Sequence, residues 1–244
     1  MLRGIAIATS ELLAQSQRLD TIASNLAEVD TPGYRADRMT EQTFRQLYLD
    51  RIDQGATAVG PLELGPVMSR PDIDLTPGPV EETGRPLDVA LTGQGFFVVQ
   101  TPNGERYTRR GAFHQDAAGR LVSLEGWPVL GQNGPISASG PLSIGPSGQV
   151  LSGSQVVGRL RVVGFPAGTQ FTREAGTYLA AEQGGTAQPL PNAGLLPGHL
   201  EGSNVDLTTT MTDLIAASRL YQAAQRALST QDQALGRLIE QTNG

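Results

Sequence analysis

The first 30 residues carry apolar side chains at a seven-residue spacing, in two rows offset by three residues. The rows are Ile5, Leu12, Leu19 and Leu26, and then Met1, Ala8, Gln15, Ile22 and Val29. Such rows form the a and d positions of a narrow helical seam, which is apolar here except at Gln15. The pattern predicts an N-terminal helix that ends near residues 28–30, because Thr31-Pro32-Gly33 reads as a turn.

The C-terminal end repeats this spacing. Large side chains step by seven and smaller apolar positions flank them: Leu207, Leu214, Tyr221, Leu228 and Leu235, with Met211, Ala217, Ala224, Leu238 and Ile239. A helix over about 205–240 is predicted, roughly 50 Å long at ~1.5 Å per residue. Ser203 or Asn204 is the expected N-cap, followed by Asp206 and Asp213 near the favourable end of the helix dipole.

The middle of the chain has a β pattern and contains all 16 prolines. Residues 87–91 alternate, and an apolar run over 96–101 leads into the turn Pro102-Asn103-Gly104, where Asn-Gly predicts a hairpin returning over 106–108. Further short strands are predicted at 111–115, 120–124, 142–144, 149–151 and 156–165. These strands have no helical pattern between them and indicate an antiparallel β domain. Residues 41–52 are weakly helical in pattern, and 55–84 have no clear periodicity.

The predicted fold class is therefore α+β, with long terminal helices forming a coiled-coil layer and a mainly antiparallel β central domain. The expected division is 1–35 plus 200–244 as the helical region, 36–84 as an irregular connection and 85–199 as the β-rich core. The heptads alone also fit two helices packed as an ordinary core, but narrow stripes favour a coiled coil, within one chain or between chains. The expected assembly interface is Ile5, Leu12, Leu19, Ile22, Leu26, Leu207, Leu214, Tyr221, Leu228 and Leu235. Within it, Leu214, Tyr221 and Leu228 should face Leu12, Leu19 and Leu26.

Composition narrows the possible functions. The net charge is −6, and all 18 cationic residues are arginine, so a basic nucleic-acid surface is not expected. No cysteine is present, which removes disulfides, thiolate catalysis and cysteine-ligated zinc. The apolar runs are too short to span a bilayer, so no membrane insertion is expected. The N-terminal sequence has no long apolar segment or small-residue cleavage site, so no cleaved secretory signal is expected either.

No catalytic constellation emerges from the polar residues. Gly93-Gln94-Gly95 is followed by Phe96 and Phe97, where a nucleotide-binding loop needs a small residue and a helix. Asp72 and Asp74 lack the further ligands of a calcium loop, and His114 is expected to be a structural residue in a strand. We therefore expect no catalytic residue, metal, cofactor or small-molecule substrate. Two other classes remain open. An envelope hydrolase would draw on Glu63, Asp72, Asp74, Glu81 or Asp88, and a binding module would use the β middle.

Three segments together resemble the flagellar axial proteins, specifically the basal-body rod family. The N-terminal motif comprises Ser24, Asn25, Leu26, Ala27, Thr31, Pro32, Gly33 and Tyr34, followed by Arg35. The core motif comprises Leu87, Asp88, Gly93, Gly95, Phe96, Phe97, Tyr107, Thr108 and Arg109. The third segment is Leu200-Glu201-Gly202-Ser203-Asn204-Val205, leading into a helix with Arg219-Leu220-Tyr221. The chain departs from the family pattern at Glu28 (usually Asn), at Tyr34-Arg35 (usually Phe-Lys) and at Gln222 (usually Glu).

The resemblance implies a structural role. In this family the terminal segments form the inner coiled-coil layer of a helical tube, the β middle forms the outer layer, and the assembled rod transmits torque from motor to hook. It also implies other rod subunits as partners, and export through the flagellar type III apparatus without a cleaved signal peptide. The expected location is the basal body within the cell envelope. The short length, with Arg85–Leu91 and Gly126–Gly131, is more similar to the proximal rod branch, and the distal rod branch is the alternative.

Overall fold

The computed structural model describes residues 2–39, 41–42, 46–51, 57–63, 67–68, 71–182, 185–191 and 193–242. The chain divides into two compact units. The helical unit holds Met1–Ala27, Asp37–Asp72 and Asp206–Gly244, and the β unit holds Glu28–Ala36 and Ile73–Val205. No helix within the described ranges combines the length and apolarity that crossing a membrane requires.

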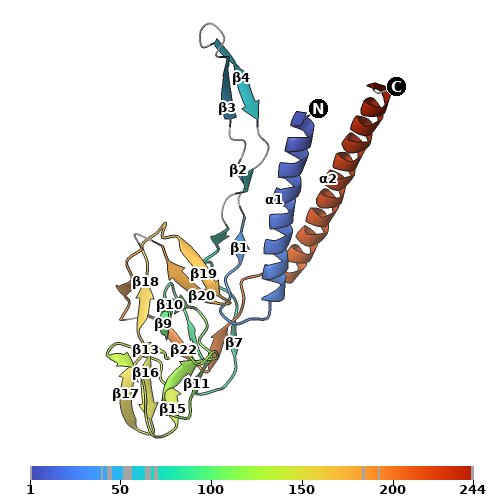
Figure 1. The fold of residues 1–244 in the computed structure, drawn as a ribbon. Helices are drawn as coiled ribbons and strands as arrows, with labels where there is room; N and C mark the ends of the chain where they lie inside the picture. The colour runs from blue at the N-terminus through green and yellow to red at the C-terminus, as the bar shows by residue number, and fades with distance from the viewer. Residues whose placement is uncertain are drawn as a thin grey trace. The chain divides into compact units, whose positions relative to one another are not determined.

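Two long helices dominate the helical unit. They are α1 (Leu2–Ala27) and α2 (Leu207–Thr242). They pack against each other and run antiparallel, so that the two chain ends lie at the same end of the pair (Figure 1). Both predicted helices are confirmed, with boundaries two or three residues from those expected.

The N-cap of α2 differs from the expected residue. The Asp206 carboxylate accepts a hydrogen bond from the backbone N–H of Thr209 at 2.9 Å, and the Asp206 carbonyl accepts one from Thr210 at 2.9 Å. Asp206 is therefore the N-cap, and the assignment to Ser203 or Asn204 was wrong. The side chain of Asn204 has partners in the β unit instead, which are described below.

The heptad residues differ in how deeply they are buried between α1 and α2. The half-buried members are Leu12, Leu19, Ile22, Leu26, Leu214, Tyr221 and Leu228. The small residues Ala14 and Ala217 are buried, as is Gln15, the single polar residue of its row. Leu207 is exposed, and so are further large apolar side chains on both helices: Leu13, Met211, Ile215 and Leu220. The side chains of Ile5 and Leu235 lie outside the described residues.

Short strands lie between residues 37 and 73, nearly all of them in the helical unit. They are β1 (Asp37–Arg38), β2 (Glu41–Gln42), β3 (Gln46–Arg51), β4 (Thr57–Glu63), β5 (Val67–Met68) and β6 (Asp72–Ile73). Strand β3 pairs with β4, and β2 pairs with β5, both antiparallel. The weak helix expected over 41–52 is therefore wrong for residues 41–42 and 46–51. A 12-residue helix is marginal alone, whereas cross-strand pairing satisfies the backbone of this segment.

The β unit is built from short antiparallel strands. They are β7 (Val80–Glu82), β8 (Val89–Leu91), β9 (Phe96–Thr101), β10 (Gly104–Thr108), β11 (Phe113–Gln115), β12 (Leu121–Ser123), β13 (Leu130–Gly131), β14 (Gly134–Pro135), β15 (Leu142–Ile144), β16 (Gln149–Ser152), β17 (Gln155–Arg159), β18 (Val162–Gly164), β19 (Phe171–Ala175), β20 (Tyr178–Ala181), β21 (Gln188–Pro189), β22 (Leu195–Pro197) and β23 (His199–Glu201). The largest sheet has the order β19-β20-β10-β9-β18-β21. The predicted antiparallel β domain is confirmed.

The predicted hairpin is present, with its loop one residue earlier than expected. Thr101 pairs with Gly104 across β9 and β10, so Pro102 and Asn103 occupy the loop. Proline cannot adopt positive φ, and Gly104, with φ of 105°, comes directly after the loop. The Thr101 hydroxyl donates to the Gly104 carbonyl at 2.9 Å and closes the turn.

Strand β9 separates two hydrophobic clusters. Alternate side chains of a strand point to opposite faces of its sheet. Phe97 and Val99 belong to the larger cluster, where Phe97 meets Phe113 edge-to-face at 5.3 Å between ring centroids. Phe96 and Val98 belong to the second cluster. Because both faces of β9 are covered, its residues form a continuous apolar run, which fits the sequence pattern.

Candidate functional site: a buried ionic joint

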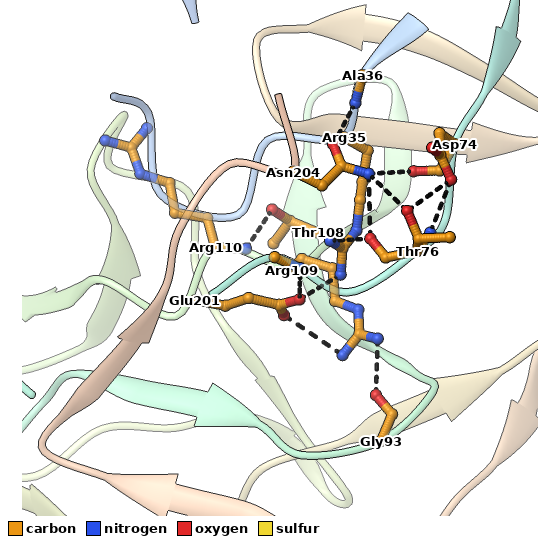
Figure 2. Close-up of polar contacts among 11 residues, drawn as sticks. Arg35, Ala36, Asp74, Thr76, Gly93, Thr108, Arg109, Arg110, Glu201 and Asn204 are labelled. Carbon is orange, nitrogen blue, oxygen red and sulfur yellow. Dashed lines mark hydrogen bonds and ion pairs between the residues drawn. The ribbon is translucent and has the colours of Figure 1, made fainter. Parts of the chain in front are cut away.

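Three segments that are far apart in the chain meet inside the β unit. They are residues 33–36, 108–110 and 201–204, taken from the three segments that carry the family resemblance (Figure 2). At their centre lie the side chains of Arg35, Arg109 and Glu201, which we call the buried ionic joint. All three belong to the β unit, so its compact fold holds them in place.

Glu201, at the end of β23, accepts bonds from two directions. Its Oε1 lies 2.5 Å from Arg35 Nη2 and also accepts the backbone N–H of Gly78 at 3.1 Å. Arg35 Nη1 donates to the carbonyl of Thr76 at 2.6 Å. The side chains of Arg35 and Glu201 are 2% and 0% exposed. Charged groups tolerate such burial when they are paired and hydrogen-bonded, so these contacts account for the position of the pair.

Arg109 approaches the same carboxylate from the other side. Its Nη1 lies 3.6 Å from Glu201 Oε2, and its Nη2 donates to the carbonyl of Gly93 at 2.6 Å. Its guanidinium carbon lies 5.6 Å from the ring centroid of Phe96. Burial lowers the pKa of Arg109 to about 10; Glu201 opposes this effect and the nearby Arg35 adds to it. The joint thus holds two cations on one carboxylate.

Gly33 brings the N-terminal motif into contact with the backbone of the core motif. It has φ of 72°, and a Cβ placed on it would lie 2.3 Å from the backbone nitrogen of Arg110. The N–H of Gly33 donates to the backbone carbonyl of Glu201 at 2.7 Å. Only glycine combines this backbone conformation with such close approach, which explains a Thr-Pro-Gly turn here.

Tyr34 and Arg35 are fixed further by Arg173 of strand β19. Tyr34 is buried, and the guanidinium carbon of Arg173 lies 4.3 Å from its ring centroid. Arg173 Nη2 also donates to the carbonyl of Arg35 at 2.5 Å. The N-terminal motif is therefore an integral part of the β unit from Gly33 to Arg35.

The side chain of Asn204, in the segment before α2, forms hydrogen bonds with two other segments of the chain. Its Oδ1 accepts the backbone N–H of Ala36 at 2.7 Å. Its Nδ2 donates to the carbonyls of Asp74 and Thr76, each at 3.0 Å. One amide thus connects three segments of the β unit, and Figure 2 shows it beside the joint.

The remaining N-terminal motif residues lie at the end of α1 or in the following turn. In the helical unit, Asn25 makes a two-point contact with Asp37: Oδ1 accepts the Asp37 N–H at 2.9 Å, and Nδ2 donates to its carbonyl at 2.8 Å. Ser24 and Ala27 are exposed, and Leu26 is half-buried. In the β unit, the Tyr34 N–H donates to the carbonyl of Thr31 at 3.2 Å, which closes the turn around Pro32.

The core motif residues have mainly structural contacts. Buried Asp88 accepts from the Thr83 hydroxyl at 2.8 Å, and the Thr108 hydroxyl accepts the Arg110 N–H at 3.0 Å. Phe96 and Phe97 divide between the two clusters, with Leu87 against the larger and Tyr107 against the second. Gly95, with φ of 142°, is buried, whereas Gly93 is exposed and supplies the carbonyl for Arg109.

Chemically, the joint is an anchoring site. Both guanidiniums form ion pairs with the Glu201 carboxylate and donate to backbone carbonyls, and among the described residues no group of three His, Cys, Asp or Glu could hold a metal ion. Of the acidic residues considered for hydrolysis, Asp74 accepts from Thr76 and Asp88 from Thr83, in separate local contacts. The side chain of Glu63 lies outside the described residues.

Sequence reasoning missed the centre of this site. Arg35, Glu201 and Asn204 lie in the segments that carry the resemblance, but they were not among the predicted site residues. Thr76 lies in a stretch without periodicity. The sequence does offer one signal: each of the three segments contains a charged residue among small or apolar ones, and opposite charges must pair if they are buried.

Comparison with known proteins shows which family profiles this chain matches. Family profiles match three successive parts: "Flagella basal body rod protein" over residues 5–35, "Flagellar hook protein FlgE/F/G D1 domain" over 90–152, and "Flagellar basal body rod FlgEFG protein C-terminal" over 196–241. These matches include the helical ends and much of the β unit.

Similar full-length proteins support the same relationship. The chain is 34% identical to flagellar basal-body rod protein FlgF of Escherichia coli (strain K12), over 92% of this chain and 93% of the relative. It is 32% identical to flagellar basal-body rod protein FlgG of Bacillus subtilis (strain 168), over 98% of each. It is 31% identical to flagellar hook-basal body complex protein FlhP of the same organism, over 97% of this chain and 98% of the relative.

Proposed function

Because the chain belongs to the flagellar basal-body rod protein family and is a structural subunit of the rod, we propose that its two terminal helices assemble with those of neighbouring subunits into a helical tube that transmits torque from motor to hook. The observation that carries this proposal is the exposed apolar surface of the helix pair. Leu207, Met211 and Ile215 follow one another at four-residue spacing along α2 and are exposed, Ile215 by 56%.

This stripe starts at the edge of the surface that α2 presents to α1, where Leu207 shares the heptad row of Leu214, and it moves away from that surface toward Ile215. Ala217 is buried and Leu214 and Tyr221 are half-buried, and these residues lie on an adjacent side of the helix at 100° per residue. Each large apolar side chain that an adjacent subunit buries contributes about 1.5–3 kcal/mol. Contacts that join different surfaces of identical subunits generate helical filaments instead of closed dimers. The coiled-coil layer is thus proposed to be held together by seams between subunits.

The buried ionic joint supports a role in load transmission. The connections after α1 and before α2 contain Gly33–Ala36 and Glu201–Asn204, and both are anchored in the β unit by buried bonds. Force on either connection would therefore act on a packed core. We propose that this joint transmits force from the helices to the β unit, which forms the outer layer, so that the β unit moves with the helices.

Partners and location follow from the family. We propose that the subunit contacts other rod subunits, itself or paralogues, in the basal body within the cell envelope, and that it reaches that place through the flagellar type III export apparatus without a cleaved signal peptide. The structural character of the family supports a non-enzymatic role. A β binding module is the alternative, and it would retain its function without the terminal helices.

Within the family we propose the proximal rod branch, on the short length and the segments Arg85–Leu91 and Gly126–Gly131. The relatives named FlgF and FlgG are 34% and 32% identical, so identity alone is a weak criterion. Complementation provides the test. Expression in strains lacking either the proximal or the distal rod gene should restore swimming only in the first, and rescue of the second alone would reverse the assignment.

The assembly proposal is tested by charge substitutions on the helices. Ile215→Asp should abolish swimming while circular dichroism of the purified chain stays unchanged, because this exposed side chain is needed only between subunits. Leu19→Asp and Leu228→Asp should also abolish swimming and leave the β unit folded. Gln17→Asp and Ala216→Asp, at exposed positions, are the controls. A motile Leu19→Asp/Leu228→Asp double variant would contradict the proposal.

A further inference from the structure

A buried amide interrupts the apolar seam between the two helices. Gln15 is 7% exposed, and its Nε2 donates to Glu11 Oε1 at 2.9 Å, one turn earlier in α1. Its Oε1 is buried and has no hydrogen-bond partner among the described residues. In its heptad row, Gln15 lies between Ala8 and Ile22, both apolar. Gln15, the one polar residue of this row, therefore has a buried carbonyl oxygen that accepts no hydrogen bond from the described residues.

The second helix repeats this feature. Gln231 of α2 is half-buried, and its Oε1 is also buried and has no partner within the described part of the chain. Each carbonyl oxygen loses its bond to water when the helices pack, and receives no other in return. An apolar residue of the same size would avoid this cost. Both glutamines consequently weaken the pairing of α1 with α2.

A polar residue in a helical seam selects partners. In coiled coils, a single buried amide lowers stability and favours the arrangement in which its hydrogen bonds are met. We propose that Gln15 and Gln231 are partner-selecting residues: they keep the α1–α2 pair of the free subunit weak, so that on assembly the helices repack against a second copy of the chain whose side-chain donors reach these amide oxygens. This inference rests on the proposed assembly of the helices.

Near-isosteric substitutions of the full chain provide the test. Gln15→Met and Gln231→Met remove the amide and keep its length, so each should raise the midpoint of thermal helix unfolding by about 2–8 °C. The controls Gln17→Met and Gln233→Met change exposed glutamines two residues away and should leave the midpoint unchanged. A midpoint that falls or stays constant in Gln15→Met and Gln231→Met would overturn the inference.

The second readout is swimming of a strain that carries the variant in place of its own gene. The more stable Gln15→Met and Gln231→Met subunits should swim less well than the Gln17→Met and Gln233→Met controls, because their helices exchange partners less readily and no longer discriminate between them. A raised midpoint with unimpaired swimming would also overturn the inference. If the two glutamine variants swim normally while Ile215→Asp does not swim, the proposed assembly stands and only the proposed role of the glutamines is wrong.

Discussion

The guanidinium of Arg35 lies 2.5 Å from the carboxylate of Glu201, although 166 positions separate them in the chain. Arg35 follows the turn after α1, and Glu201 ends the strand before the segment that leads into α2. The pair therefore ties the two connecting segments together within one buried site. Three measurable consequences follow from this site and a fourth from the turn at Asp116, and Trp127, the single tryptophan, reports on the β unit.

Glu201→Gln should destabilise the β unit by about 3–5 kcal/mol, because it leaves two buried guanidiniums without a carboxylate. Urea unfolding followed by Trp127 fluorescence measures the change. Glu81→Gln is the matched control, since Glu81 is exposed on β7, opposite Leu200 in the same strand pair. We expect the control to stay within about 0.5 kcal/mol of the parent protein. If the two substitutions change the free energy of unfolding equally, the ion pair of Arg35 and Glu201 does not stabilise the β unit more than an exposed glutamate does.

Gly33→Ala should cost more than about 2 kcal/mol, because the backbone is left-handed and the new Cβ would overlap the backbone of Arg110. Gly84 provides an informative comparison, with a similar φ of 67° but open space around its Cβ position. Gly84→Ala should therefore show only the conformational cost of about 1 kcal/mol. Urea midpoints of both variants check this order, and a Gly84→Ala cost as large as that of Gly33→Ala would refute the role of close approach.

Asn204→Ala should lower stability by about 1–3 kcal/mol, since one backbone N–H and two carbonyls lose their side-chain partner. Hydrogen exchange provides a local readout: the Ala36 amide, whose acceptor is removed, should exchange faster than in the parent protein. Gln132→Ala, at an exposed position of the same unit, serves as control. Unchanged protection of Ala36 would mean that the Asn204 bond does not hold that segment.

The turn at Asp116 should make stability depend on pH. Backbone N–H donation from Arg120, together with the Arg120 side chain, lowers the pKa of Asp116 from its ordinary value of 3.8. A lowered folded pKa stabilises the protein above the unfolded value, and this contribution is lost as pH falls through the folded value. Asp116→Asn should hence be less stable than the parent protein at neutral pH, and the two unfolding curves should converge in acid. A difference that persists in acid would exclude the charge as its source.

Much of the fold followed from local patterns. The heptads predicted α1 and α2, since helix periodicity and the absence of proline act within a few turns. The alternation, hairpin and short-strand signals likewise predicted β8 to β12 and β15 to β18, although the predicted stretch 156–165 is divided between β17 and β18. Strands β19 and β20 escaped prediction because β19 carries Arg173 and Glu174 in its centre, and because β20 joins this hairpin to the sheet by pairing with β10, which is distant in the chain.

The sequence by itself determined the helical ends, the antiparallel β middle and the family, because these depend on residue spacing along the chain. Only the tertiary structure decided that Arg35, Arg109 and Glu201 meet, and that Asp206, not Asn204, caps α2. Burial is a property of the packed chain: an arginine in a polar turn and a glutamate at a strand end have no local reason to pair. The fold removes both from water, and the free energy of an unpaired buried charge then makes their contact necessary.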